Sequence, residues 1–268
     1  MGREGGQRSS APLQGGAPED FLLIALFVAR CCFISIAGIA LFPRPVSGIG
    51  RHAIFSPVMD KFRILCFGDS NTWGYTPGTG RRLPEKKRWT SVMQEILGGE
   101  YEVIPEGLSG RTVDVDDQFW RGRNASKQLP RILQKHAPLS LVILMLGTND
   151  LKERFDREVE EIARGAGKLV DLIRASRAGP SGIPPRVLLV APPELTEATE
   201  ERSPEFFGAA LKSSRLAAAY RTVAEEHECL FLNAALLAAV STVDGVHLES
   251  SEHARLGGAI ARLVRRIR

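Results

Sequence analysis

Five short apolar runs, separated by stretches with helical spacing, constrain the fold of this chain more than any other feature. The strongest is LSLVILML at 139–146, whose continuous apolar character is typical of a strand buried on both faces. Such strands pair in parallel and need helices on both faces of their sheet, so the alternation predicts an α/β protein with three layers, α/β/α. The runs expected to form strands are 64–67, 101–105, 139–146, 186–191 and 230–232.

The stretches between these runs are expected to form helices at 88–97, 126–136, within 156–178, at 203–226 and at 250–267. Ser203, Pro204 and Glu205 offer an N-cap, a proline suited to the first helical position and an early acid. In parallel sheets of this kind, ligands bind beyond the carboxyl ends of the strands. The loops that follow the five strands are therefore where chemistry is expected.

Residues 1–58 read as an N-terminal extension ahead of one domain at 59–268. Residues 1–20 are rich in Gly, Ser, Pro and Gln, a composition typical of disorder. Residues 21–42 are apolar over about the length of a membrane span, but Arg30 interrupts them. Three interpretations stay open: a translation start at Met59, an anchor or uncleaved signal, and a regulatory arm. Membrane contact or export is expected only if the apolar segment is retained, and a cytoplasmic protein otherwise.

Charge and cysteine content exclude several classes of function. The net charge of +4, from 35 basic and 31 acidic residues, is spread along the chain rather than gathered in a stripe that would bind nucleic acid. The 4 cysteines contain no CxxC pair, so neither a zinc site nor a disulfide framework is expected. We expect no metal and no cofactor.

Four of the loops after the strands carry polar side chains. Gly68-Asp69-Ser70 follows the first strand, EGLSGRT (106–112) the second and GTND (147–150) the third, and DGVH (244–247) lies beyond the fifth. Because serine is a weak nucleophile without an adjacent base, and histidine is the usual base, Ser70 and His247 form a candidate pair.

A D-x-x-H spacing on one turn can bring the Asp244 carboxylate to the His247 ring, where it would fix the tautomer of the imidazole. Acyl transfer also needs donors for an oxyanion. The backbone N–H groups of Ser70 and Gly110 and the side-chain amide of Asn149 are the candidates.

These blocks resemble the SGNH (GDSL-type) hydrolase family over about residues 63–264. The stretches ILCFGDSNTWGY, RWTSVMQEILG, EVIPEGLSGRT, LVILMLGTNDLK and DGVHL are similar to its bacterial arylesterase/acyltransferase branch. The resemblance implies a flavodoxin-like, mainly parallel sheet of five strands and metal-free hydrolysis of carboxylic esters. It implies that Ser70 is the nucleophile, His247 the base and Asp244 its partner. It further implies an oxyanion hole of Ser70, Gly110 and Asn149, and a homo-oligomer.

The expected function is a serine esterase that acts on small-molecule esters of small acyl groups and can also transfer the acyl group to alcohols. A carbohydrate O-deacetylase and, in a different class, a catalytically silent binding protein remain as alternatives. Trp73 and Tyr75 are expected to bind substrate. Asn71 stands where the family name has leucine, and is expected to shape the pocket wall.

Other polar residues are expected to have structural roles. Asp69 should shape its turn through an Asx-type bond, and Asp150 should cap the helix that follows it. His253 is expected on a helix surface, His136 without an acidic partner and His227 in solvent. The aromatic residues Phe119 and Trp120 are expected either to line the pocket or to pack at a subunit interface.

Overall fold

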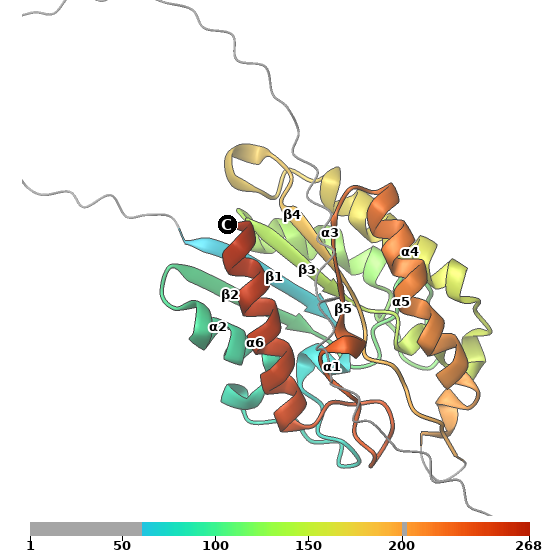
Figure 1. Ribbon diagram of the computed structural model, residues 1–268. Coiled ribbons are helices and arrows are strands. Elements are labelled where there is room, and N and C mark those ends of the chain that lie inside the picture. Colours follow the sequence, from blue (N-terminus) through green and yellow to red (C-terminus); the bar gives the residue numbers. More distant parts are fainter. Residues whose placement is uncertain (1–60, 200–202) are drawn as a thin grey trace, which may run out of the picture. The chain divides into compact units, whose positions relative to one another are not determined.

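The computed structural model describes residues 61–199 and 203–268, which form a five-stranded sheet between two layers of helices (Figure 1). The strands lie in the order β2-β1-β3-β4-β5, and every neighbouring pair is parallel. The prediction of a three-layer α/β fold with a parallel five-stranded sheet is confirmed. The strands are β1 (Phe62–Gly68), β2 (Tyr101–Gly107), β3 (Leu141–Met145), β4 (Arg186–Ala191) and β5 (Leu230–Asn233).

Alternate residues of the central strands enter two separate cores. Ile64 and Cys66 of β1 belong to the core beneath α2 (Trp89–Leu97) and α6 (Ser250–Ile267). Leu65 and Phe67 belong to the core on the opposite face. Both faces are therefore dry, which explains why the central strands are continuously apolar rather than alternating.

The second core is covered by α3 (Ala125–His136), α4 (Val159–Arg174) and α5 (Ala209–Glu226). Figure 1 shows α2 and α6 on one side of the sheet, with α4 and α5 on the other. Pro130 lies inside α3, whose first turn is capped by the Asn124 side chain. A four-residue helix, α1 (Ser70–Trp73), follows β1 directly.

The segment before α5 differs from the prediction. Instead of one helix from Ser203, a short 3₁₀ turn at Pro204–Phe206 comes first and α5 begins at Ala209. Ser203 and Gly208 both have positive φ angles, 51° and 70°, which interrupt a right-handed helix. The Ser203 hydroxyl makes no cap and instead donates to the Asp244 carbonyl at 2.8 Å, a long-range contact that local sequence does not encode.

The predicted N-terminal extension at 1–58 lies outside the described residues, as does its apolar segment at 21–42. Among the residues that are described, no helix combines the length and apolar character needed to cross a bilayer.

Candidate active site

Ser70 is the first residue of α1, at the carboxyl end of β1. Asp69 caps this helix, because its carboxylate accepts a hydrogen bond from the Asn71 N–H at 3.0 Å. Two glycines let the helix lie against the strand ends: a Cβ on Gly107 would collide with the Trp73 nitrogen, and one on Gly68 would collide with the Thr72 side chain. The Asx-type role predicted for Asp69 is confirmed.

Asp244 organises the loop that carries His247. Its Oδ1 accepts the backbone N–H groups of Val246 at 3.0 Å and His247 at 2.9 Å. Its Oδ2 lies 2.8 Å from His247 Nδ1 and accepts the Gly78 N–H at 3.1 Å. Burial acts to raise the pKa of Asp244, but the hydrogen bonds from the His247 ring and backbone, the charge of that ring and the Val246 N–H lower it to about 2. Asp244 is therefore a carboxylate at neutral pH.

The structure brings Ser70 to the other nitrogen of the same ring. His247 Nε2 lies 3.0 Å from Ser70 Oγ, although the two residues are 177 positions apart in the chain. With a proton on Nδ1 facing Asp244, Nε2 is left as the acceptor for the serine hydroxyl. Ser70, His247 and Asp244 thus form one continuous line of hydrogen bonds that can move a proton from serine to imidazole.

Outside the helices and strands of the described residues, the backbone N–H groups of Ser70 and Gly110 make no backbone hydrogen bond. Gly110 has a φ of 78°, a left-handed conformation that favours glycine. Asn149 begins the 3₁₀ turn after β3, and its Nδ2 donates to the Arg111 carbonyl at 3.1 Å. The amide keeps a second hydrogen for another acceptor.

Asp150 ties these two loops together, which corrects its predicted role as a helix cap. Its buried carboxylate accepts the Val113 N–H at 3.0 Å and Arg157 Nη1 at 2.8 Å. The next helix, α4, is capped instead by Glu158. Burial, only partly opposed by Arg157 and the Val113 N–H, raises the pKa of Asp150 to about 7. Through Asp150, the loop of Asn149 is fixed to the loop that follows Gly110.

Arg111 is a supporting residue that the sequence analysis missed. It is 3% exposed, and its Nη1 donates to the Gly68 carbonyl at 2.7 Å and to the Glu106 carbonyl. Its guanidinium also lies 4.1 Å from the centroid of the Phe67 ring. Burial lowers the pKa of Arg111 to about 10, which leaves it positive at neutral pH. Its main partners are backbone carbonyls at the ends of β1 and β2, which side-chain patterns in a sequence do not reveal.

The three residues expected to bind substrate lie in different surroundings. Tyr75 stacks on the His247 ring, with centroids 4.1 Å apart and planes 25° apart. Trp73 lies 6.4 Å from Tyr75 and beneath the guanidinium of Arg82. Asn71 is only 2% exposed, and its amide is bonded to the backbone around His247. The expected part of Asn71 in the pocket wall stays a prediction.

Two other histidines differ from expectation, and a third gains a partner. His253 is fully buried rather than on a helix surface, and its Nδ1 accepts the Trp89 N–H at 3.2 Å. His136 does have an acidic partner, with Nε2 at 2.6 Å from a Glu106 carboxylate oxygen. His227 is partly exposed, as predicted, and lies 2.9 Å from an oxygen of the exposed Asp171. All three pairings join segments that are far apart in the sequence.

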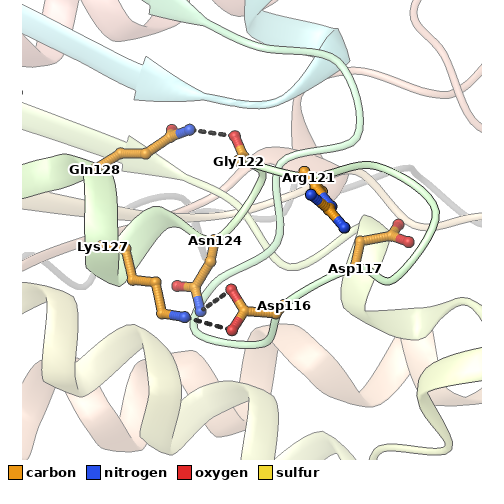
Figure 2. A pocket seen from close by; sticks show the side chains of 7 residues that line it. All are labelled: Asp116, Asp117, Arg121, Gly122, Asn124, Lys127 and Gln128. Atoms are coloured by element: carbon orange, nitrogen blue, oxygen red, sulfur yellow. Dashed lines mark hydrogen bonds and ion pairs between the residues drawn. The ribbon is translucent and has the colours of Figure 1, made fainter.

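A hollow of about 310 Å³ lies on the loop between β2 and α3, and none of Ser70, His247 and Asp244 lines it. Figure 2 shows Asp116 bonded to Lys127 and Gln128 bonded to the Gly122 carbonyl, while Asp117 and Arg121 make no bond to the other residues drawn. The lining of this hollow contains no serine, cysteine or histidine. Over the described ranges, no cluster of three or more His, Cys, Asp or Glu side chains could hold a metal ion.

Comparison with known proteins gives a consistent result. Residues 66–255 match the model of the GDSL-like lipase/acylhydrolase family. Est24, a carbohydrate acetylesterase from Sinorhizobium meliloti, is 40% identical, with a TM-score of 0.74 over 78% of this chain and 100% of that one. The native aryl esterase of M. smegmatis is 39% identical, with a TM-score of 0.73 over 76% of this chain and 98% of that one. Comparison with curated proteins finds no match.

Proposed function

The chain belongs to the GDSL-like lipase/acylhydrolase family and is a carboxylic ester hydrolase, and from this premise we propose that it cleaves esters of small acyl groups through an acyl-enzyme on Ser70. The observation that carries the proposal is the line of hydrogen bonds from Asp244 through His247 to Ser70, with distances of 2.8 and 3.0 Å. A serine in this arrangement can be deprotonated as it attacks a carbonyl.

In the first half of the reaction, Ser70 Oγ attacks the ester carbonyl while His247 Nε2 takes its proton. The carbonyl oxygen becomes an oxyanion that receives hydrogen bonds from the N–H groups of Ser70 and Gly110 and from Asn149. Asp244 stabilises the imidazolium and holds its orientation. The tetrahedral intermediate then collapses, and the alcohol leaves with the proton from His247.

In the second half, water attacks the acyl-enzyme and gives its proton to His247, which returns it to Ser70 as the acid departs. An alcohol in place of water would complete the same cycle and form a new ester. Acyl transfer to alcohols is therefore part of the proposal. It is measured as the ester formed at the expense of free acid when benzyl alcohol is added to the assay.

Hydrolysis of p-nitrophenyl esters, from acetate to octanoate, by the wild type and Ser70→Ala tests the mechanism. We expect the highest kcat/KM for the shortest acyl groups and a loss of roughly 10⁴–10⁶-fold in kcat for Ser70→Ala, since no other group can form the acyl-enzyme. Ser91→Ala on α2 is the matched control and should keep wild-type activity. Substantial activity in Ser70→Ala contradicts the mechanism, and a folded but inactive wild type would favour the silent binding protein.

A second candidate substrate class is the acetylated carbohydrate, supported by the likeness to Est24, itself a carbohydrate acetylesterase. The reaction at Ser70 would be the same, and only the leaving alcohol would differ. Acetate release from a peracetylated sugar and from phenyl acetate, compared as kcat/KM, separates the two classes because the acyl group is held constant.

A further inference from the structure

Asn71 stands directly after Ser70 on α1, and its side chain bonds to both neighbours of His247. Its Nδ2 donates to the Val246 carbonyl at 3.2 Å, and its Oδ1 accepts the Leu248 N–H at 3.0 Å. We infer that Asn71 is a positioning residue that sets the place of the His247 imidazole relative to Ser70. The inference rests on the proposed acyl-enzyme mechanism and assigns Asn71 no contact with the substrate.

The surroundings of Asn71 leave its side chain one orientation. It is 2% exposed, and both polar atoms of the amide are used by the two backbone groups. Its own backbone N–H is held by the Asp69 carboxylate at 3.0 Å. Asp69, the cap of α1, therefore fixes the backbone of Asn71, and the Asn71 side chain in turn holds the loop of His247.

The loop itself has little regular structure to hold it in place. It lies between the isolated bridge partner Val240 and the start of α6, and its internal bonds include Ser241 N–H to the His247 carbonyl at 2.7 Å. Bonds from other segments reach it at Asp244 and Gly245: from Gly78 N–H, Ser203 Oγ and Thr196 N–H. The Asn71 side chain hydrogen-bonds the backbone on both sides of His247.

Two neighbouring residues of α1 thus contact two neighbouring parts of one loop: Ser70 contacts the His247 ring, and Asn71 contacts the backbone beside it. Ser70 and Asn71 share one turn of α1, while His247 lies between the two residues that Asn71 bonds. Any shift of the loop along α1 would change the distance of 3.0 Å between His247 Nε2 and Ser70 Oγ. Because proton transfer depends steeply on this distance, a displacement of about 1 Å can reduce the rate by about 10²-fold.

Two substitutions of similar size test the inference. Asn71→Leu removes both hydrogen bonds, and Asn71→Asp keeps the acceptor but cannot donate to the Val246 carbonyl. For each, we expect kcat with p-nitrophenyl acetate to fall by about 10–100-fold with KM within about threefold. The second-order rate at which a fluorophosphonate labels Ser70 should fall in parallel, because it reports on the nucleophile without depending on ester binding.

Asn233→Ala is the control for loss of a structural asparagine. The Asn233 side chain accepts the Ala235 N–H at 3.0 Å at the end of β5, outside α1 and outside the loop of His247. It should keep wild-type kcat. Circular dichroism and thermal midpoints show which variants are folded, and if Asn71→Leu does not fold, Asn71→Asp decides on the same readouts.

Wild-type kcat and labelling rate in a folded Asn71 variant would overturn the inference. A raised KM with unchanged kcat would overturn it too, because that pattern indicates contact with substrate. Failure of the underlying mechanism looks different, since it would leave Ser70→Ala active. If Ser70→Ala is inactive while both Asn71 variants have full activity, only the positioning role is wrong.

Discussion

Tyr75 is the residue whose ring covers the imidazole of His247. The two rings stack with centroids 4.1 Å apart, so Tyr75 limits how far the imidazole can turn from Ser70. Aromatic pairs contribute about 0.5–1.5 kcal/mol, which corresponds to roughly 2–12-fold in rate if the contact is lost in the transition state. We therefore expect kcat to fall within that range in Tyr75→Ala and to stay near wild type in Tyr75→Phe, as measured by steady-state hydrolysis of p-nitrophenyl acetate.

The pair of variants separates the ring from the hydroxyl. If Tyr75→Phe loses as much activity as Tyr75→Ala, the phenol oxygen is the important group and the stacking argument is wrong. If Tyr75→Ala raises KM and leaves kcat unchanged, the ring belongs to the substrate pocket, as the sequence alone had suggested.

Residue identity along the chain predicted which three side chains the structure brings together, but not the groups that hold them. Ser70, His247 and Asp244 stand in loops that a parallel sheet must bring to one edge, so their proximity follows from topology. Arg111 and Asn71 act mainly on backbone carbonyls and N–H groups. Every residue has a backbone carbonyl and almost every residue has an N–H group, so the sequence does not show which of them a side chain will bind.

At the scale of elements, the contact between α2 and α6 contains a titratable helix cap. Arg88 provides no side-chain cap for α2, and His253 on α6 accepts the Trp89 N–H in its place. Only a neutral imidazole can accept this bond, and a cation would also face the positive end of α2. Burial, followed by the charges of His247 and Arg88, lowers the pKa of His253 to about 4.

The lowered pKa predicts a loss of stability in acid. The folded state holds His253 neutral, whereas the unfolded chain binds its proton near pH 6.5, so stabilisation is complete above that pH and is lost as the pH falls towards 4. The contribution of His253 to the free energy of unfolding that is lost in this way is about 3 kcal/mol. Urea unfolding of His253→Asn, whose Oδ1 can accept the same N–H without titrating, should show a flatter dependence between pH 6.5 and 4.

His227→Asn is the control for this experiment, because that residue lies on the other face of the sheet near the end of α5. It should retain the wild-type loss of stability in acid. An equally steep dependence in His253→Asn would show that another group is responsible for it.

Elements were predictable where local pattern and tertiary packing agree. β4 (Arg186–Ala191) and α6 (Ser250–Ile267) have the predicted bounds, since each combines a clear apolar period with clear ends. The predicted start of α5 at Ser203 was wrong, because the Ser203 hydroxyl donates its hydrogen bond to the Asp244 carbonyl and does not cap the helix. The burial of His253 was missed because the residues around it at the start of α6 are polar. Its partner, the Trp89 N–H, lies in a distant segment of the sequence.

At the scale of the whole molecule, the parallel sheet gathers four distant blocks at one edge, and an outer loop exposes two large aromatic side chains. Phe119 and Trp120 are 70% and 51% exposed, on a loop whose turn is held by Asp117. The indole of Trp120 lies near Gly110, where a Cβ would stand 3.5 Å from it. Exposed aromatic side chains are enriched at subunit interfaces. We therefore expect this loop to form the interface of the homo-oligomer that the family resemblance predicts.

We expect light scattering to give a mass that is a multiple of the 29.3 kDa chain. The double substitution Phe119→Ser, Trp120→Ser should lower it towards one chain, because it removes the apolar surface without touching Asp117. Leu211→Ser on α5 is the matched control, since Leu211 is 72% exposed and lies on a helix distant in sequence from the loop. A single-chain mass for the wild type would contradict this interface. A rise in KM for the double substitution, with the mass unchanged, would then assign Phe119 and Trp120 to the substrate entrance.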